Sequence, residues 1–237
     1  MQLFYNPHLS EDTQEIKFDK EESRHIVTVL RMKEGQTLTI TNGKGSFFSV
    51  EITNAHPKAC LASKISTEKQ PPIPYQLHLA VAPTKLNDRY EWFLEKATEI
   101  GITEISPIIC DHSERKIIKN DRYEKILQSA MKQSLKAYLP VLNEAVNFNE
   151  FIESQKNSVT QKYIAHCEQM DKKTLKSILK PSQNLLILIG PEGDFSNEEI
   201  QLAIENGFAP VSLGETRLRT ETAAIVACHS VAFINQK

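Results

Sequence analysis

The hydrophobic residues of this 237-residue chain fall into short runs with polar turns between them. Residues 185–189 are five consecutive apolar residues closed by a glycine-proline pair, which is typical of a strand buried on both faces. Residues 75–82 and 105–110 are further strand candidates. The stretch between them, 90–100, has helical periodicity with Trp92 on the inward face. A strand, a helix and a strand in succession predict a parallel sheet and therefore an α/β fold.

The C-terminal third repeats one local plan twice. After the run at 185–189 comes a loop with Gly190, and Ser196 then predicts a helix N-cap with a glutamate three residues later. A second short strand at 211–213 precedes Gly214, and Thr220 predicts the cap of the final helix. The apolar stripe of that helix is Ala223, Ala224, Ala227, Val231 and Ile234. Two strand ends, each followed by a glycine loop and a helix start, predict a ligand site at the carboxyl edge of the sheet.

The first part of the chain has a different pattern. Residues 19–31 predict one helix with Val29 on its inward face. Two alternating stretches, 37–41 and 47–52, flank a glycine-rich turn and predict a β-hairpin, and 58–66 adds another strand. Several short strands with one helix predict a small barrel.

A proline cluster separates the two patterns. Three of the four residues between 71 and 74 are proline, which cannot continue a helix or a central strand and makes a stiff linker. We therefore expect two domains, 1–72 and 73–237.

Composition and charge narrow the class of protein. The longest apolar run is far shorter than a membrane span, and the N-terminus has neither the basic start nor the apolar core of a signal peptide. The four cysteines are far apart and form no C-x-x-C pair, so neither a zinc site nor a disulfide framework is expected. These features predict a cytoplasmic protein without a metal.

Charge is distributed unevenly along the chain. The formal net charge is −2, yet residues 112–136 hold seven bases against three acids, which predicts a strip for RNA or a solvated helix face. The glycine loops are acidic instead, with Glu192 and Glu215 among their residues. Neither loop matches a phosphate-binding glycine motif, and their charge would repel a triphosphate. They suit an uncharged or cationic small molecule.

Two motifs in these loops are familiar. Ile-Gly-Pro-Glu-Gly-Asp-Phe at 189–195 and Leu-Gly-x-x-x-Leu-Arg-Thr-Glu-Thr-Ala at 213–223 closely resemble the RsmE family of SPOUT-class methyltransferases. The stretches at 25–31 and 42–46 resemble the PUA-like barrel that precedes the catalytic domain in that family. The sequence departs from the usual motif at Asp194, where the family has a glycine.

The resemblance implies an N-terminal PUA-like β-barrel and a C-terminal SPOUT α/β domain with a deep trefoil knot. It implies transfer of a methyl group from S-adenosyl-L-methionine (SAM) to N3 of a uridine in 16S ribosomal RNA, by a homodimer. The cofactor residues that it indicates are His166, Glu168, Leu188, Ile189, Gly190, Pro191, Glu192, Gly193, Leu213, Gly214, Leu218, Thr220 and Thr222. We expect the glycines among them to let a ligand approach the backbone.

Catalysis at N3 requires help because that nitrogen carries a proton. Arg219 is the first candidate, since a guanidinium can stabilise the electron-rich uracil through a carbonyl oxygen, and Arg217 is the second. Glu221 is a weaker base because the helix dipole favours its carboxylate, so we expect it to orient Arg219 or a cofactor group. The residues expected to contact RNA are Arg24, His25, Arg31, Lys33, Lys85, Arg89, Arg115, Lys116, Gln133 and Ser134.

Two other functions fit the same residues. A knotted methyltransferase could modify a different atom, such as a ribose 2′-oxygen. A non-catalytic RNA-binding protein of ribosome assembly could keep the fold, although scaffolding alone would not require Arg219, Thr220 and Glu221.

Overall fold

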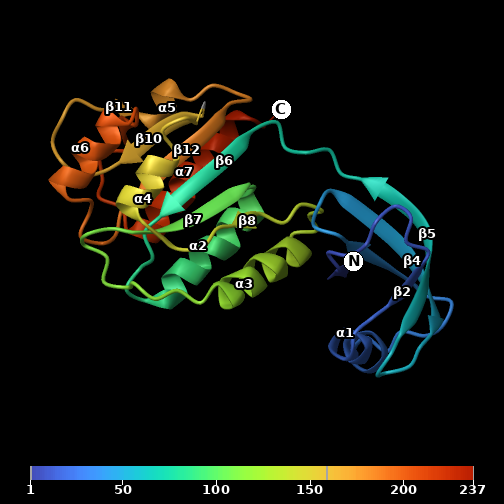
Figure 1. Ribbon diagram of the computed structural model, residues 1–237. Helices are drawn as coiled ribbons and strands as arrows, with labels where there is room; N and C mark the ends of the chain where they lie inside the picture. Colours follow the sequence, from blue (N-terminus) through green and yellow to red (C-terminus); the bar gives the residue numbers. More distant parts are fainter. Residues whose placement is uncertain (1, 159, 237) are drawn as a thin grey trace. The chain divides into compact units, whose positions relative to one another are not determined.

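The computed structural model describes residues 2–158 and 160–236, which form two compact units (Figure 1). The first unit comprises Met1–Pro72 with Met131–Leu139, and the second comprises Ile73–Ala130 with Pro140–Lys237. No helix within the described residues is long and apolar enough to cross a membrane.

The first unit is built on a five-stranded sheet. Its elements are β1 (Leu3–Tyr5), β2 (Glu15–Lys17), α1 (Lys20–Arg24), the π-helical turn η1 (His25–Val29), β3 (Thr37–Thr41), β4 (Ser46–Asn54) and β5 (Leu61–Lys69). The strand order is β1-β3-β4-β5-β2, and all pairs are antiparallel except β1 with β3. The predicted hairpin is β3 and β4.

The predicted helix at 19–31 is wrong in its second half. The α-helix gives way to the π-helical turn η1, which changes the rotation per residue. Ile26 is fully buried in the core of the sheet, but Val29 is 65% exposed instead of facing inward.

Residues 131–139 belong to the first unit, and the chain leaves the helical conformation within this segment. Helix α3 (Asn120–Gln133) ends before Leu135, whose φ of 54° leaves the helical region, so the predicted helix at 128–137 is placed too late. The amide of Gly45 donates to the carbonyl of Ala137 at 2.8 Å, and the amide of Leu139 donates to the carbonyl of Gly43 at 2.9 Å.

The second unit is an α/β domain around a parallel sheet, as predicted. Its strands are β6 (Gln76–Val81), β7 (Glu104–Ile109), β8 (Val141–Leu142), β9 (Val146–Asn147), β10 (Gln161–Ala165), β11 (Lys173–Thr174), β12 (Asn184–Ile189) and β13 (Ala209–Ser212). The order is β11-β13-β10-β12-β6-β7-β8, with β9 also paired to β7, and every pair is parallel. Strand β10 thus lies between the two strands that precede the glycine loops.

Helices cover both faces of this sheet. Besides α3, they are α2 (Asn87–Ile100), α4 (Phe148–Ser154), α5 (Leu175–Ile178), α6 (Asn197–Glu205) and α7 (Thr220–Ile234). Helices α2 and α7 pack together and α7 lies against β6 and β12, whereas α4 and α6 pack together on the other face. Trp92 of α2 is 44% exposed, so its predicted inward position is wrong.

Local sequence accounts for where α6 begins. Ser196 accepts a hydrogen bond from the amide of Glu199, and the Glu199 carboxylate accepts one from the amide of Ser196. This capping box confirms the predicted helix start. Helix α6 is the next element after β12, so the cap also fixes where the loop between them ends.

Candidate active site

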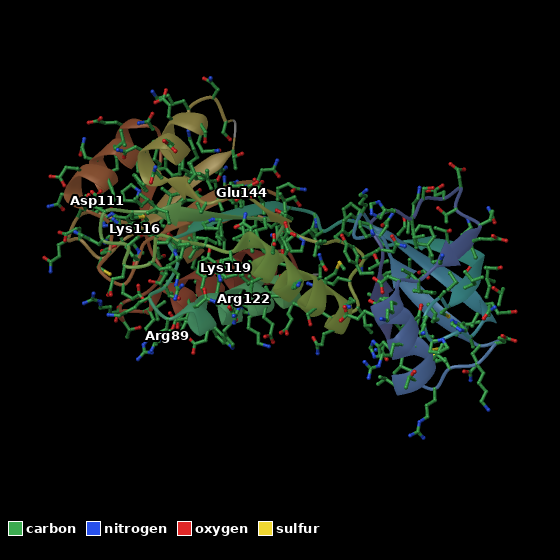
Figure 2. All side chains as sticks on the ribbon, turned by 60° about the horizontal axis from the view of Figure 1, so that its bottom comes forward. Arg89, Asp111, Lys116, Lys119, Arg122 and Glu144 are labelled. Atoms are coloured by element: carbon green, nitrogen blue, oxygen red, sulfur yellow. The ribbon has the colours of Figure 1, made fainter. Side chains whose placement is uncertain are left out.

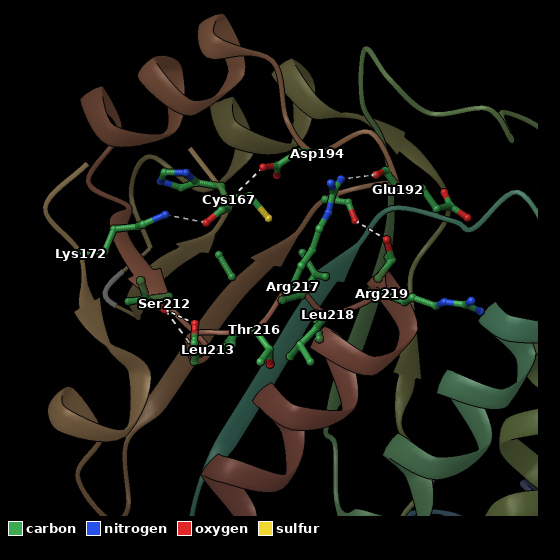
Figure 3. A pocket seen from close by; sticks show the side chains of 18 of the residues that line it. Cys167, Lys172, Glu192, Asp194, Ser212, Leu213, Thr216, Arg217, Leu218 and Arg219 are labelled. Carbon is green, nitrogen blue, oxygen red and sulfur yellow. Dashed lines mark hydrogen bonds between the residues drawn. The ribbon is translucent and has the colours of Figure 1, made fainter. Parts of the chain in front are cut away.

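A cavity of about 520 Å³ lies where β10, β12 and β13 end (Figure 3). The predicted cofactor residues that line it are His166, Ile189, Gly190, Pro191, Glu192, Leu213, Gly214, Leu218 and Thr220. Arg217 and Arg219 line it as well. Other predicted positions, Glu168, Leu188, Gly193, Thr222 and Glu221, are not among its lining residues. The expected edge of the sheet therefore does hold a pocket.

Strand β10 and the loop after it supply residues of this pocket besides the predicted His166. Ala165, Cys167 and Lys172 line it from the end of β10 and the following loop, and Val211, Ser212, Glu215, Thr216 and Ala223 complete the side formed by β13 and α7. The signal that would have found the β10 residues is the strand order, because β10 separates β12 from β13.

Asp194 ties two of the loops together. Its φ of 65° places it in the left-handed region, which a glycine adopts more easily. Its carboxylate accepts hydrogen bonds from the amide of Cys167 at 2.6 Å and from the amide of Phe195 at 2.9 Å. Asp194 thus joins the loop after β12 to the loop after β10.

The glycines of the first loop have a packing role. A Cβ on Gly190 would lie 3.0 Å from the ring of Phe195, and one on Gly193 would lie 3.0 Å from Cβ of His112. At both positions, atoms of the protein itself occupy the space that a Cβ would need, so glycine is required there by internal packing. The close approach of a ligand to the backbone of Gly190 stays a prediction. Gly214 is different, because its φ is 144° and a Cβ would meet nothing within 4 Å.

Two arginines approach the pocket from the segment before α7. The Nη2 atom of Arg217 donates to the carbonyl of Glu192 at 3.5 Å, across the opening between two loops. Figure 3 shows Arg219 extending on the other side, toward α2. The carboxylate of Glu192 is held by the amide of Lys85 at 2.9 Å, so the loop after β6 is fixed to the pocket as well.

The start of α7 differs from the prediction. Thr220 is the first helical residue and Arg219 is the N-cap, without a side-chain capping bond. The Thr220 hydroxyl instead donates to the carbonyl of Gly190 at 3.0 Å. The helix is therefore attached to the loop after β12, and the predicted capping role of Thr220 is wrong.

Glu221 is buried beside Arg89 of α2. Its Oε1 atom lies 3.9 Å from Nε of Arg89, and its Oε2 atom has no hydrogen-bond partner among the described residues. The charged group that the structure places against Glu221 is thus Arg89, whereas the sequence had suggested Arg219.

His166 is buried at the pocket with both ring nitrogens unpartnered among residues 2–158 and 160–236. Burial lowers its pKa, and the nearby Lys172 ammonium lowers it further. The imidazole is therefore neutral at pH 7, with one donor and one acceptor free for a ligand. The thiol of Cys167, by contrast, has a pKa raised by burial and by Asp194, which disfavours a nucleophilic role.

The predicted RNA contacts occur in both units. Arg24, Arg31 and Lys33 are exposed, whereas the His25 ring is half-buried, 5.9 Å from the ring of Phe4. Gln133 and Ser134 lie at the end of α3 and just after it, in the segment that belongs to the first unit.

In the second unit, Lys85 pairs with Glu114 at 2.7 Å, and Arg115 donates to the carbonyls of Thr84 and Lys85. Lys116 is exposed, and Figure 2 labels it with Lys119 in the segment that leads into α3 and with Arg122 in the first turn of that helix.

Comparison with protein families and curated proteins decides the class. A model described as an RNA methyltransferase domain matches residues 71–232, and one described as an RNA methyltransferase PUA domain matches residues 18–65. Ribosomal RNA small subunit methyltransferase E of Buchnera aphidicola is 34% identical over 227 residues, which cover 91% of this chain and 87% of that protein. The chain belongs to the small-subunit rRNA methyltransferase E family.

Solved structures agree with this family. A probable rRNA methyltransferase from Porphyromonas gingivalis is 42% identical, with a TM-score of 0.91 and coverage of 99% of this chain and 98% of that one. The methyltransferase E structure from Neisseria gonorrhoeae, bound to SAM, is 29% identical, with a TM-score of 0.84 and coverage of 96% and 95%. Both structures match this methyltransferase E family member over its two units.

Proposed function

We propose that this chain transfers a methyl group from SAM to N3 of a uridine in 16S ribosomal RNA. The observation that carries the proposal is the pocket at the ends of β10, β12 and β13, in a chain of the methyltransferase E family. The predicted loops line this pocket with main-chain atoms and with Arg217 and Arg219. Lys172 is the one other lysine or arginine among the lining residues.

The residues present fit SAM. A volume of about 520 Å³ is in the range of small-molecule sites. The neutral His166 ring offers a donor and an acceptor that no described residue takes. The three carboxylates of the lining, Glu192, Asp194 and Glu215, stand against three cations, Lys172, Arg217 and Arg219. The pocket therefore has no excess of positive charge, which suits an uncharged or cationic ligand better than a triphosphate. The SAM-bound structure from Neisseria gonorrhoeae is a methyltransferase E as well.

The protein's own residues prepare the acceptor base. When bound, SAM supplies a methyl group on a positively charged sulfur. Arg219 donates to a carbonyl oxygen of uracil and so stabilises the anion that remains once the N3 proton has passed to solvent water. Arg217, held at Glu192 across the pocket opening, helps to exclude water. Glu221 does not remove the proton in this scheme, because it is buried and faces Arg89.

The assignment also gives roles to the other parts of the molecule. Residues 1–72, together with residues 131–139, serve as an RNA-docking domain through Arg24, His25, Arg31 and Lys33. The rest of the chain serves as the catalytic domain. Membership of the methyltransferase E family supports a trefoil knot in the catalytic domain. The active protein is a homodimer that works on RNA in the cytoplasm without a metal.

Nucleoside analysis tests the proposed reaction. Small-subunit particles and naked 16S rRNA, both lacking the modification, are incubated with the protein and SAM, then digested for mass spectrometry. We expect one 3-methyluridine per rRNA molecule. A ribose-methylated nucleoside would assign a different acceptor atom, and RNA binding without any methyl transfer would contradict the enzyme.

A further inference from the structure

The contact between Glu221 and Arg89 joins the starts of two neighbouring helices. Glu221 lies in the first turn of α7 and Arg89 in the first turn of α2, and these helices pack against each other. The Glu221 side chain is only 9% exposed, whereas that of Arg89 is 33% exposed. The carboxylate is thus an internal anchor, and the guanidinium reaches from it toward solvent.

The pair is incompletely satisfied as it stands. A buried carboxylate is costly unless it is paired and hydrogen-bonded. The separation of 3.9 Å allows an ion pair but exceeds the length of a hydrogen bond, and Oε2 of Glu221 has no partner within the described residues. Hydrogen bonds in active sites are often long in the absence of the substrate and shorten when it binds.

Arg89 has donors to spare. A guanidinium carries five N–H groups, and only the Nε side of Arg89 faces Glu221. No acceptor in the described part of the chain takes a hydrogen bond from its two terminal nitrogens. A planar fork with unused donors matches the geometry of a phosphate.

The position of Arg89 beside the pocket indicates which phosphate of an RNA strand it would contact. Arg219 stands two residues before Glu221, lines the pocket and extends toward α2 in Figure 3. A strand whose uracil enters the pocket carries a phosphodiester on each side of that nucleotide. We propose that Glu221 is a positioning residue that holds Arg89 against an RNA phosphate flanking the target uridine. The inference rests on the proposed function.

The salt dependence of RNA binding tests the phosphate contact. Binding of a uridine-containing single-stranded oligonucleotide is measured at several salt concentrations for wild type, Arg89→Ala and Arg89→Lys. Each neutralised phosphate adds about 0.7 to the slope of log K against log salt. We expect Arg89→Ala to bind about tenfold more weakly with a slope lower by about 0.7, and Arg89→Lys to keep the slope.

Lys96→Ala is the matched control. Lys96 lies on the same helix, its side chain is also 33% exposed, and it is paired with Glu95 and Glu99. The substitution removes one positive charge from α2 and should leave the slope unchanged. An Arg89→Ala slope equal to that of wild type would overturn the phosphate contact.

A double-mutant cycle tests the positioning role of Glu221. Glu221→Gln keeps the shape of the side chain and should weaken RNA binding severalfold while SAM affinity, measured by calorimetry, stays unchanged. If Glu221 acts through Arg89, this substitution adds no further loss in the Arg89→Ala background. Independent, additive losses would overturn the positioning role.

The same samples separate this inference from the proposed function. Wild-type protein that forms no 3-methyluridine would contradict the function, yet the salt slopes would still decide whether Arg89 contacts phosphate. Wild-type activity with an unchanged Arg89→Ala slope would contradict this inference alone.

Discussion

At the residue scale, His166 is the most specific polar group in the pocket. It is 7% exposed and both of its ring nitrogens lack a partner within the described residues, so a ligand that bonds them gains without displacing an internal bond. His166→Ala should weaken SAM binding about tenfold, the loss expected for one to two hydrogen bonds. Calorimetry measures this, with the exposed His8→Ala as the control. If the two variants bound SAM with equal affinity, His166 would not contact the cofactor.

Arg219 is expected to act on the transition state rather than on cofactor binding. Arg219→Ala should lower kcat by about 100-fold, the usual effect of losing one donor to a developing oxyanion, with little change in SAM affinity. Single-turnover methyl transfer to undermethylated small-subunit particles gives the rate. If Arg217→Ala lowered the rate and Arg219→Ala did not, the transition-state role would belong to Arg217 and not to Arg219.

At the scale of elements, the capping box of α6 fixes the end of the pocket loop. Ser196 bonds the amide of Glu199, and its hydroxyl also donates to the carboxylate of Asp111 at 2.8 Å. Ser196→Ala should lower the free energy of unfolding by about 1 kcal/mol. Chemical denaturation checks this against Asn197→Ala, which changes the exposed next residue of the same helix. Equal stabilities of the two variants would contradict the cap's contribution.

A second cluster links β6 and β7 and should make stability depend on pH. His78 contacts the Ser106 hydroxyl at 2.8 Å, and its Nδ1 atom lies 3.7 Å from Glu104. Burial lowers the pKa of His78 below its ordinary 6.5, and the Glu104 carboxylate only partly offsets this. The unfolded chain therefore binds the proton more readily, so stability falls as the pH drops below about 6.5.

Denaturant midpoints measured between pH 7.5 and pH 5 check this dependence. In His78→Gln, the part of the decrease due to this histidine should disappear, because glutamine keeps polar contacts without titrating. Identical pH profiles for the variant and wild type would contradict the assignment.

At the scale of the whole molecule, the sequence predicted the parts that depend on local chemistry. The buried run before Gly190, the start of α6 at Ser196 and the parallel sheet all follow from residues close together in the chain. The position of β10 between β12 and β13, and the meeting of Arg89 with Glu221, depend on strand order and helix packing. No periodicity encodes these long-range relations. The resemblance supplied His166 on the β10 side of the pocket, whereas Ala165 and Lys172 were not predicted.

The homodimer is a further prediction at this scale. Light scattering at micromolar concentration should give twice the chain mass of 26.9 kDa. The final helix α7 exposes Phe233 at 65%, which leaves apolar surface available to a second copy. A single-chain mass would contradict the dimer.

A crystal structure with SAM tests the central claim most directly. The account predicts the cofactor in the pocket formed by the loops after β10, β12 and β13, with a polar atom within hydrogen-bond distance of the His166 ring. Density for SAM elsewhere on the chain, with this pocket empty, would contradict it.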